Sequence, residues 1–166
     1  MKTLIAYATK TGTARKAAEA LADALRAKGG EVVLHDLATD TSMPDADAII
    51  VGGSVRFGQW DKRSLQYVKD NEHKLFHKTY ALFACRCGKD NTRALLEPQI
   101  GETLSNDAIA VVNLGGEMDI HKQKGMDRLV VKMLGKKLDE TMSSTGVLTD
   151  AVNDLADQVW NALPNA

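Results

Sequence analysis

Cysteine, proline and aromatic residues are scarce in this chain, which has two cysteines, three prolines and 5% aromatic residues among its 166 residues. The two cysteines, Cys85 and Cys87, are one residue apart, so they cannot link distant segments as structural disulfides do. No apolar run approaches the roughly 20 residues that a membrane-spanning helix needs, and residues 1–3 show no signal-peptide pattern. These absences favour a cytoplasmic location.

An excess of charge of one sign is also missing. The formal net charge is -1 at pH 7, which argues against a nucleic-acid-binding protein and against a strongly acidic electron carrier. The four histidines are scattered, without the spacing of a nucleophile and its base, and with two cysteines they form no zinc-ligand pattern. We therefore expect neither a nucleic-acid partner nor a metal site.

What the chain does have is an alternation of apolar runs and amphipathic segments. The runs predict strands at residues 3–8, 31–35, 47–53, 79–85 and 108–114. The other segments predict helices at residues 14–28, 61–75, 91–104, 120–138 and from 149 onward. The runs are apolar throughout, as in a parallel sheet that is covered on both faces. We predict one α/β domain over residues 1–166, with a doubly wound five-stranded parallel sheet and helices on both faces.

The first predicted strand ends in a turn rich in hydroxyl groups, Thr9-Lys10-Thr11-Gly12-Thr13, here called the threonine turn. A turn between a strand and a helix presents backbone N–H groups and the positive end of the helix dipole, which together suit a phosphate. The turn lacks both the Walker pattern and the Gly-x-Gly-x-x-Gly of a dinucleotide site. It therefore indicates a terminal phosphate, and the alternative is an ordinary helix N-cap with additional threonines.

Two further loops are predicted beyond the carboxyl ends of the strands, where ligands of doubly wound sheets bind. They are Ser54-Val55-Arg56-Phe57-Gly58 and Cys85-Arg86-Cys87-Gly88. Glycine allows backbone to approach a flat ring, and Phe57 and Trp60 could stack on it. The alternative is that both aromatic side chains pack on the following helix.

Three segments carry a resemblance to the flavodoxin superfamily that covers essentially the whole chain. They are Ala8-Thr9-Lys10-Thr11-Gly12-Thr13-Ala14-Arg15, Ile50-Val51-Gly52-Gly53-Ser54-Val55-Arg56-Phe57-Gly58 and Asp127-Arg128-Leu129-Val130-Val131-Lys132-Met133. The middle segment is the most specific of the three. Within the superfamily the chain most resembles the menaquinone-dependent protoporphyrinogen IX dehydrogenases.

This resemblance implies the strand order 2-1-3-4-5, FMN as cofactor, and two-electron oxidation with electrons passed to a quinone or a partner redox protein. A porphyrinogen is the implied substrate. The cofactor-binding residues that it implies are Thr9, Lys10, Thr11, Gly12, Thr13, Ala14, Ser54, Val55, Arg56, Phe57, Gly58, Cys85, Arg86, Cys87 and Gly88. Arg56 is also the predicted catalytic residue, because a guanidinium beside the flavin would raise its reduction potential. It could instead pair with a substrate carboxylate or lie in solvent.

A basic segment, residues 120–137, has six lysines and arginines against the single acid Asp127. Its apolar residues recur at helical spacing, so it could rest on an anionic membrane surface near a quinone. Base rates favour an ordinary amphipathic helix whose apolar stripe covers the sheet. Two functions remain as alternatives to the enzyme, a flavodoxin-type electron shuttle without its own substrate and a flavodoxin-fold binding module that has lost FMN.

Overall fold

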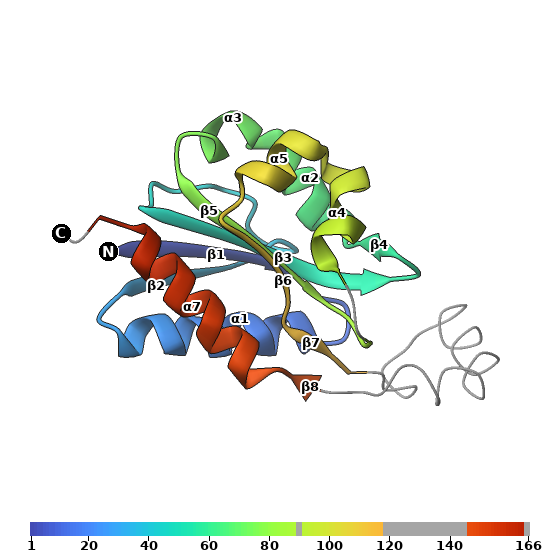
Figure 1. Cartoon of the computed structure of the whole chain (residues 1–166), viewed down its shortest axis with the longest axis horizontal. Coiled ribbons are helices and arrows are strands. Elements are labelled where there is room, and N and C mark those ends of the chain that lie inside the picture. Colours follow the sequence, from blue (N-terminus) through green and yellow to red (C-terminus); the bar gives the residue numbers. More distant parts are fainter. Residues whose placement is uncertain (89–90, 118–145, 165–166) are drawn as a thin grey trace.

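The computed structural model describes residues 1–88, 91–117 and 146–164. Its main sheet has five parallel strands (Figure 1). The strands are β1 (Lys2–Ala8), β2 (Glu31–Asp36), β3 (Ala48–Arg56), β5 (Thr79–Cys85) and β6 (Ala110–Asn113). Their spatial order is β2-β1-β3-β5-β6, and each neighbouring pair is parallel. Counted along the chain this is the predicted order 2-1-3-4-5, so the predicted flavodoxin-like fold is confirmed.

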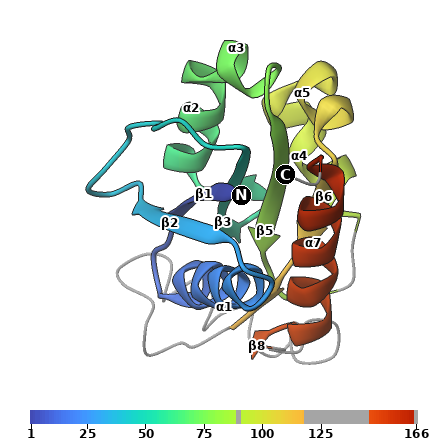
Figure 2. The same cartoon turned by 90° about the vertical axis from the view of Figure 1, so that its left-hand side faces the viewer.

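Helices cover both faces of this sheet (Figures 1 and 2). One face carries α1 (Thr13–Ala27) and α7 (Thr149–Ala162). The other carries α2 (Lys62–Asp70), α3 (Glu72–Leu75), α4 (Thr92–Ile100) and α5 (Glu102–Asp107). Successive side chains of a strand point to opposite faces, so Ile5 packs in the α1 core and Leu4 in the α2 core, and both are fully buried.

The first helix follows its sequence pattern closely. The predicted stripe is fully buried, and its members are Ala14, Ala17, Ala18, Leu21 and Leu25. At the carboxyl end Gly29 adopts φ 93°. Its N–H donates to Arg26 O at 2.8 Å, and the N–H of Gly30 donates to Leu25 O at 3.0 Å. These two bonds form the Schellman motif that a glycine after a helix favours.

Several element boundaries differ from the prediction. The predicted helix over 61–75 is divided at Asn71, and the one over 91–104 ends at Gly101, whose φ of 96° stops α4. The predicted strand over 47–53 continues to Arg56 and turns back into β4 (Gln59–Trp60). A second small sheet pairs β7 (Gly115–Gly116) with β8 (Gly146–Val147). The predicted helix over 120–138 lies outside the described residues.

Close packing of β3 against its neighbours explains its glycine pair. A Cβ atom at Gly52 would lie 1.9 Å from the ring of Phe83 on β5, which leaves no room for any side chain. A Cβ atom at Gly53 would lie 2.5 Å from Ser64 Oγ on α2.

None of the described helices has the length and apolar character that a membrane span requires.

Candidate functional site

The structure brings all three predicted loops to one edge of the sheet. In the register of the strands Ala8 pairs with Gly53, and Ser54 pairs with Cys85. The threonine turn, the end of β3 and the segment after β5 are therefore neighbours at the carboxyl ends of the parallel strands. Ligands of doubly wound sheets bind at this edge, at the point where the strand order reverses.

The start of α1 differs from the start of every other described helix. The N-cap residue is Gly12, which makes no side-chain cap hydrogen bond, and the first turn contains no acidic residue. Each of the other described helices has a side-chain cap or an acid in its first turn. No described side chain caps the first turn of α1, so its N–H groups after Gly12 and its dipole can meet an outside anion, and this counts against the alternative of an ordinary N-cap.

Within the threonine turn, Thr9 Oγ1 accepts the Gly12 N–H at 2.9 Å, and Gly12 has φ 101°. Lys10 is exposed, while Thr11 and Gly12 are half-buried. The side chain of Ala14 is fully buried and that of Thr13 nearly so. Ala14 can therefore contribute to binding only through its backbone N–H.

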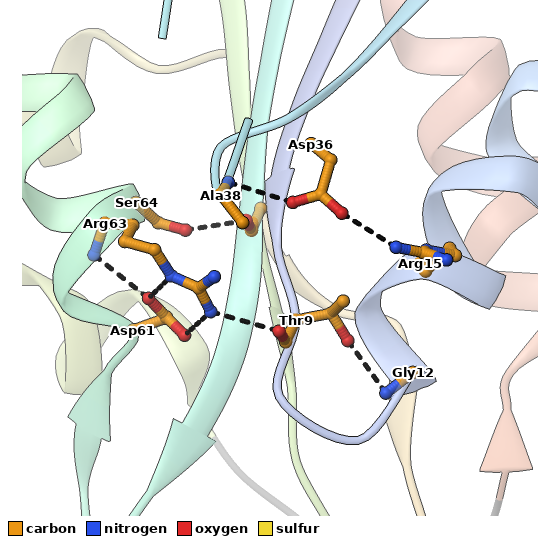
Figure 3. Close-up of polar contacts among 9 residues, drawn as sticks. Thr9, Gly12, Arg15, Asp36, Ala38, Asp61, Arg63 and Ser64 are labelled. Atoms are coloured by element: carbon orange, nitrogen blue, oxygen red, sulfur yellow. Dashed lines mark hydrogen bonds and ion pairs between the residues drawn. The ribbon is translucent and has the colours of Figure 1, made fainter. Parts of the chain in front are cut away.

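Two ion pairs flank the threonine turn (Figure 3). On one side Arg15 Nη2 donates to Asp36 Oδ2 at 2.8 Å. On the other, Arg63 pairs with Asp61, and Arg63 Nη2 also donates to the backbone carbonyl of Thr9 at 3.0 Å. Burial by itself would raise the pKa of Asp61, but the hydrogen bonds from Arg63 outweigh it and lower that pKa. Asp61 is therefore an anion whose charge is already paired.

The second loop is a tight hairpin at the end of β3. Arg56 pairs with Gln59, and the two turn residues, Phe57 and Gly58, have φ 49° and 73°. Two positive φ values in a two-residue hairpin turn are typical of type I′. The side chain of Phe57 is held out at the edge of the site and is 63% exposed.

Trp60 does not share this exposure. It is 1% exposed in the core between the sheet and α2, and its indole Nε1 donates to Phe83 O at 3.3 Å. Its backbone N–H donates to Gln99 Oε1 at 2.9 Å. The expectation that Trp60 stacks on a bound ring is therefore wrong, and for this residue the alternative of packing inside the protein holds.

Ser54 supplies a test of whether the site fits a ligand. Its hydroxyl oxygen is buried and has no hydrogen-bond partner among the described residues, although it lies at the end of β3 beside the threonine turn. Buried hydroxyl groups are rarely left without a partner. A polar ligand at this edge would supply one, so the residues present fit a polar ligand such as a phosphate with an attached polyol chain.

The third loop is fixed by Asn113 at the end of β6. Asn113 Oδ1 accepts the Arg86 N–H at 3.3 Å, and Asn113 Nδ2 donates to Arg86 O at 3.2 Å. A Cβ atom at Gly116 would lie 2.5 Å from Cys87 N, so β7 packs directly against this loop. These contacts anchor the backbone of Arg86 and Cys87 at the edge of the site.

Neither cysteine of this loop has the environment of a reactive thiol. Both are buried free thiols, and burial raises the pKa of Cys85 to about 12 and also raises the pKa of Cys87. A thiol with a raised pKa stays protonated near neutral pH and is a poor nucleophile and metal ligand. Within residues 1–88, 91–117 and 146–164 no three histidine, cysteine or acidic side chains are grouped as a metal site requires.

Asp61, Arg63 and Asn113 also belong to this site, although no sequence motif assigned them to it. Asp61 had a readable signal, because it stands where a helix was expected to start and serves as its N-cap. The contacts of Arg63 with Thr9 and of Asn113 with Arg86 join segments far apart in the chain. No local pattern could have revealed those two contacts.

Several solved flavodoxin structures share this fold. Oxidised Flavodoxin 2 from Bacillus cereus is 19% identical with a TM-score of 0.62, over 98% of this chain and 100% of that one. A short-chain flavodoxin associated with a bacterial microcompartment is 14% identical with a TM-score of 0.56, over 98% of each chain. A flavodoxin from the domain Archaea is 16% identical with a TM-score of 0.52, over 96% of this chain and 99% of that one.

At identities of 14% to 19%, the similarity to these three structures shows a shared fold and nothing more. A comparison with curated proteins gives no match. The model of the flavodoxin domain, in contrast, matches residues 4–145, a span that includes all three loops of the site. On this match, together with the sheet order and the three loops at its carboxyl edge, the chain belongs to the flavodoxin domain family.

Proposed function

We propose that this chain is an FMN-dependent oxidoreductase that takes two electrons from an organic substrate and passes them to a quinone or a partner redox protein. The observation that carries the proposal is the start of α1, which has neither a side-chain cap nor an acid and lies beside two further loops. Such a helix end binds phosphate groups. Membership of the flavodoxin domain family and this set of donors both support FMN as the cofactor.

Each loop has a part in holding this cofactor. The threonine turn would hold the phosphate. The hydroxyl of Ser54, which has no partner in the described part of the chain, would meet the polyol chain, and Phe57 would meet the flat ring. The backbone of residues 85–88 would border the ring from the other side. FMN supplies transfer of one or two electrons at its isoalloxazine ring.

Positive charge in the loops favours an oxidoreductase over a low-potential carrier. Each of the three loops carries one basic residue, Lys10, Arg56 and Arg86 in turn. A positive group near the ring stabilises the negative charge that reduction adds and so raises the reduction potential. Arg56 is the residue that we assign to this role.

A porphyrinogen is the substrate that we propose, on the resemblance of residues 50–58 to the protoporphyrinogen IX dehydrogenases. The carboxylates of such a substrate offer a second use for an arginine at the site, since a guanidinium pairs with a carboxylate through two parallel hydrogen bonds. A flavodoxin-type electron shuttle is the second candidate. It is favoured by the 63% exposure of Phe57, an aromatic contact open to a partner protein at the edge of the site.

The chromophore and the turnover of the purified protein test these alternatives. A yellow protein whose released flavin is FMN is the expected result, and a colourless protein that binds no added FMN would overturn the proposal. Oxidation of protoporphyrinogen IX that requires an added quinone is expected of the enzyme. Reduction by a flavodoxin reductase, without any turnover of the porphyrinogen, would instead identify a shuttle.

A further inference from the structure

Arg63 joins the first turn of α2 to the threonine turn, 54 residues away along the chain (Figure 3). Its Nη2 donates to the backbone carbonyl of Thr9 at 3.0 Å. The same guanidinium donates to both carboxylate oxygens of Asp61, from Nε at 3.0 Å and from Nη2 at 2.9 Å. The planar fork of arginine is thereby fixed by a carboxylate on one side and holds a loop carbonyl on the other.

The helix end that carries Arg63 is itself anchored to β3. Asp61 caps α2 by accepting the Arg63 N–H at 3.0 Å, and its own N–H donates to Ser54 O at 2.9 Å. Ser64 Oγ donates to Gly52 O at 2.8 Å, and Gly53 leaves no space between the strand and this helix. Arg63 therefore reaches the threonine turn from a fixed position.

The bond to Thr9 has a consequence for the donors of the turn. The described peptide bonds are all trans. In a trans peptide the C=O and the following N–H point in opposite directions, so holding Thr9 O toward Arg63 turns the Lys10 N–H away from it. It also keeps the partial negative charge of this carbonyl from facing a bound anion. The hydroxyl of Thr9 closes the same turn by accepting the Gly12 N–H.

We propose that Arg63, held by Asp61, is a positioning residue that sets the backbone of the threonine turn for a phosphate monoester. The inference rests on the proposed binding of FMN. It differs from a purely structural role for Arg63, because the bond to Thr9 lies in the turn proposed to hold the phosphate and its loss should affect that end of the ligand more than the ring. Riboflavin has the same ring and polyol chain but no phosphate, so it is the matched ligand for this distinction.

The test compares FMN and riboflavin affinities of the full chain, freed of flavin, by fluorescence titration. Arg63→Gln should weaken FMN on the order of tenfold, the effect of one hydrogen bond to a charged group, and leave riboflavin unchanged. Lys62→Gln removes the same charge from an exposed neighbour and should change both affinities by less than about twofold. Equal losses of FMN and riboflavin would overturn the inference, since they indicate general damage to the site.

Arg63→Lys separates geometry from charge and serves if Arg63→Gln fails to fold. Lysine keeps the charge but cannot bond to Asp61 and Thr9 in the same forked geometry, so we expect a loss of FMN affinity close to that of Arg63→Gln. FMN affinity equal to that of the parent would show that charge alone suffices and would overturn the positioning role.

Amide NMR of the flavin-free protein tests the inference independently of FMN. Either Arg63 variant should shift the Lys10 and Gly12 amide resonances and speed hydrogen exchange at Gly12, and Lys62→Gln should do neither. Unchanged resonances would overturn the inference even if the protein binds FMN. If the parent binds no FMN, the proposed function fails, and these resonances still decide whether Arg63 orders the threonine turn.

Discussion

Phe57 has the least favourable backbone conformation of the described residues other than glycine, with φ 49°. A side chain with a Cβ pays roughly 1–2 kcal/mol to adopt this left-handed region. The side chain is also 63% exposed, so burial does not offset that cost. The type I′ hairpin turn requires this conformation and holds the ring out at the edge of the site, and we propose that Phe57 is the aromatic residue that meets the ligand or the partner.

Thr11→Asp tests the phosphate assignment at the level of one residue. The change places a carboxylate among N–H and hydroxyl donors, so FMN affinity should fall by at least ~1.5–3 kcal/mol, the contribution of one hydrogen bond to a charged group. Fluorescence titration measures the loss. Thr41→Asp adds the same charge in an exposed loop and should leave the affinity close to that of the parent. Parent-like affinity in Thr11→Asp would rule out the threonine turn as the phosphate site.

Arg56→Ala tests the assigned role of the hairpin arginine. If Arg56 is the countercharge for the reduced ring, its loss should lower the midpoint potential by about 30 mV or more, which for two electrons corresponds to ~1.4 kcal/mol. Redox titration gives the potential, and Arg26→Ala at the far end of α1 is the control. An unmoved potential with lost turnover would make Arg56 a substrate residue, and no change in either would exclude it from both roles.

Among the elements, α1 and α2 start at the same edge of the sheet but are stabilised differently. The start of α2 has the buried cap Asp61, whose side chain is 4% exposed, whereas α1 begins at Gly12 without a cap. A side-chain cap contributes about 0.5–2 kcal/mol to a helix. An anion bound at the start of α1 would take the place of the missing cap. Its binding should therefore stabilise α1.

Asp61→Asn makes the contribution of the Asp61 charge, paired with Arg63, visible through pH. Because its folded-state pKa is lowered, Asp61 stabilises the folded protein above its ordinary pKa of about 3.9, and this stabilisation is lost as the pH falls through the lowered value. Asparagine keeps an acceptor for the cap but does not titrate. Urea unfolding should therefore show the parent as the more stable protein at pH 7 and a difference that shrinks below about pH 4. A difference independent of pH would contradict the assignment.

At the scale of the whole molecule, charge is distributed unevenly along the chain. Residues 120–137 carry a net charge of +5, so the remainder carries -6. This segment lies outside the described residues, and the prediction for it comes from its sequence. An amphipathic helix of a globular domain ordinarily packs its apolar stripe on the core, while the negative remainder opposes approach to an anionic membrane.

We therefore expect little sedimentation of the protein with anionic vesicles at physiological salt. An interfacial helix would instead gain about 1 kcal/mol for each lysine or arginine near the surface, and that binding would weaken as salt shortens the Debye length. Strong, salt-sensitive binding that is abolished by replacing Lys132, Lys136 and Lys137 with glutamate would contradict the expectation. It would also favour direct transfer of electrons to a membrane quinone.

The sequence by itself determined the layered architecture and the edge of the sheet at which the three loops of the candidate site meet. Strands that are buried on both faces must be apolar at every position, so runs such as 79–85 are recognisable locally, and this prediction matches β5 residue for residue. A helix stripe and a terminal glycine are equally local, which is why α1 was predicted well. The carboxyl ends of parallel strands share one edge, so the three loops could be placed together before any contact was known.

The tertiary structure alone decided what each side chain of these loops does. Phe57 and Trp60 are three residues apart with similar chemistry, yet the tight hairpin turns one outward and buries the other. That the buried hydroxyl of Ser54 has no partner among the described residues follows from its tertiary surroundings and not from its local sequence. The bonds from Arg63 to Thr9 and from Asn113 to Arg86 join residues far apart in the chain. Local patterns encode burial and backbone conformation, but such pairings exist only once the sheet has brought its loops together.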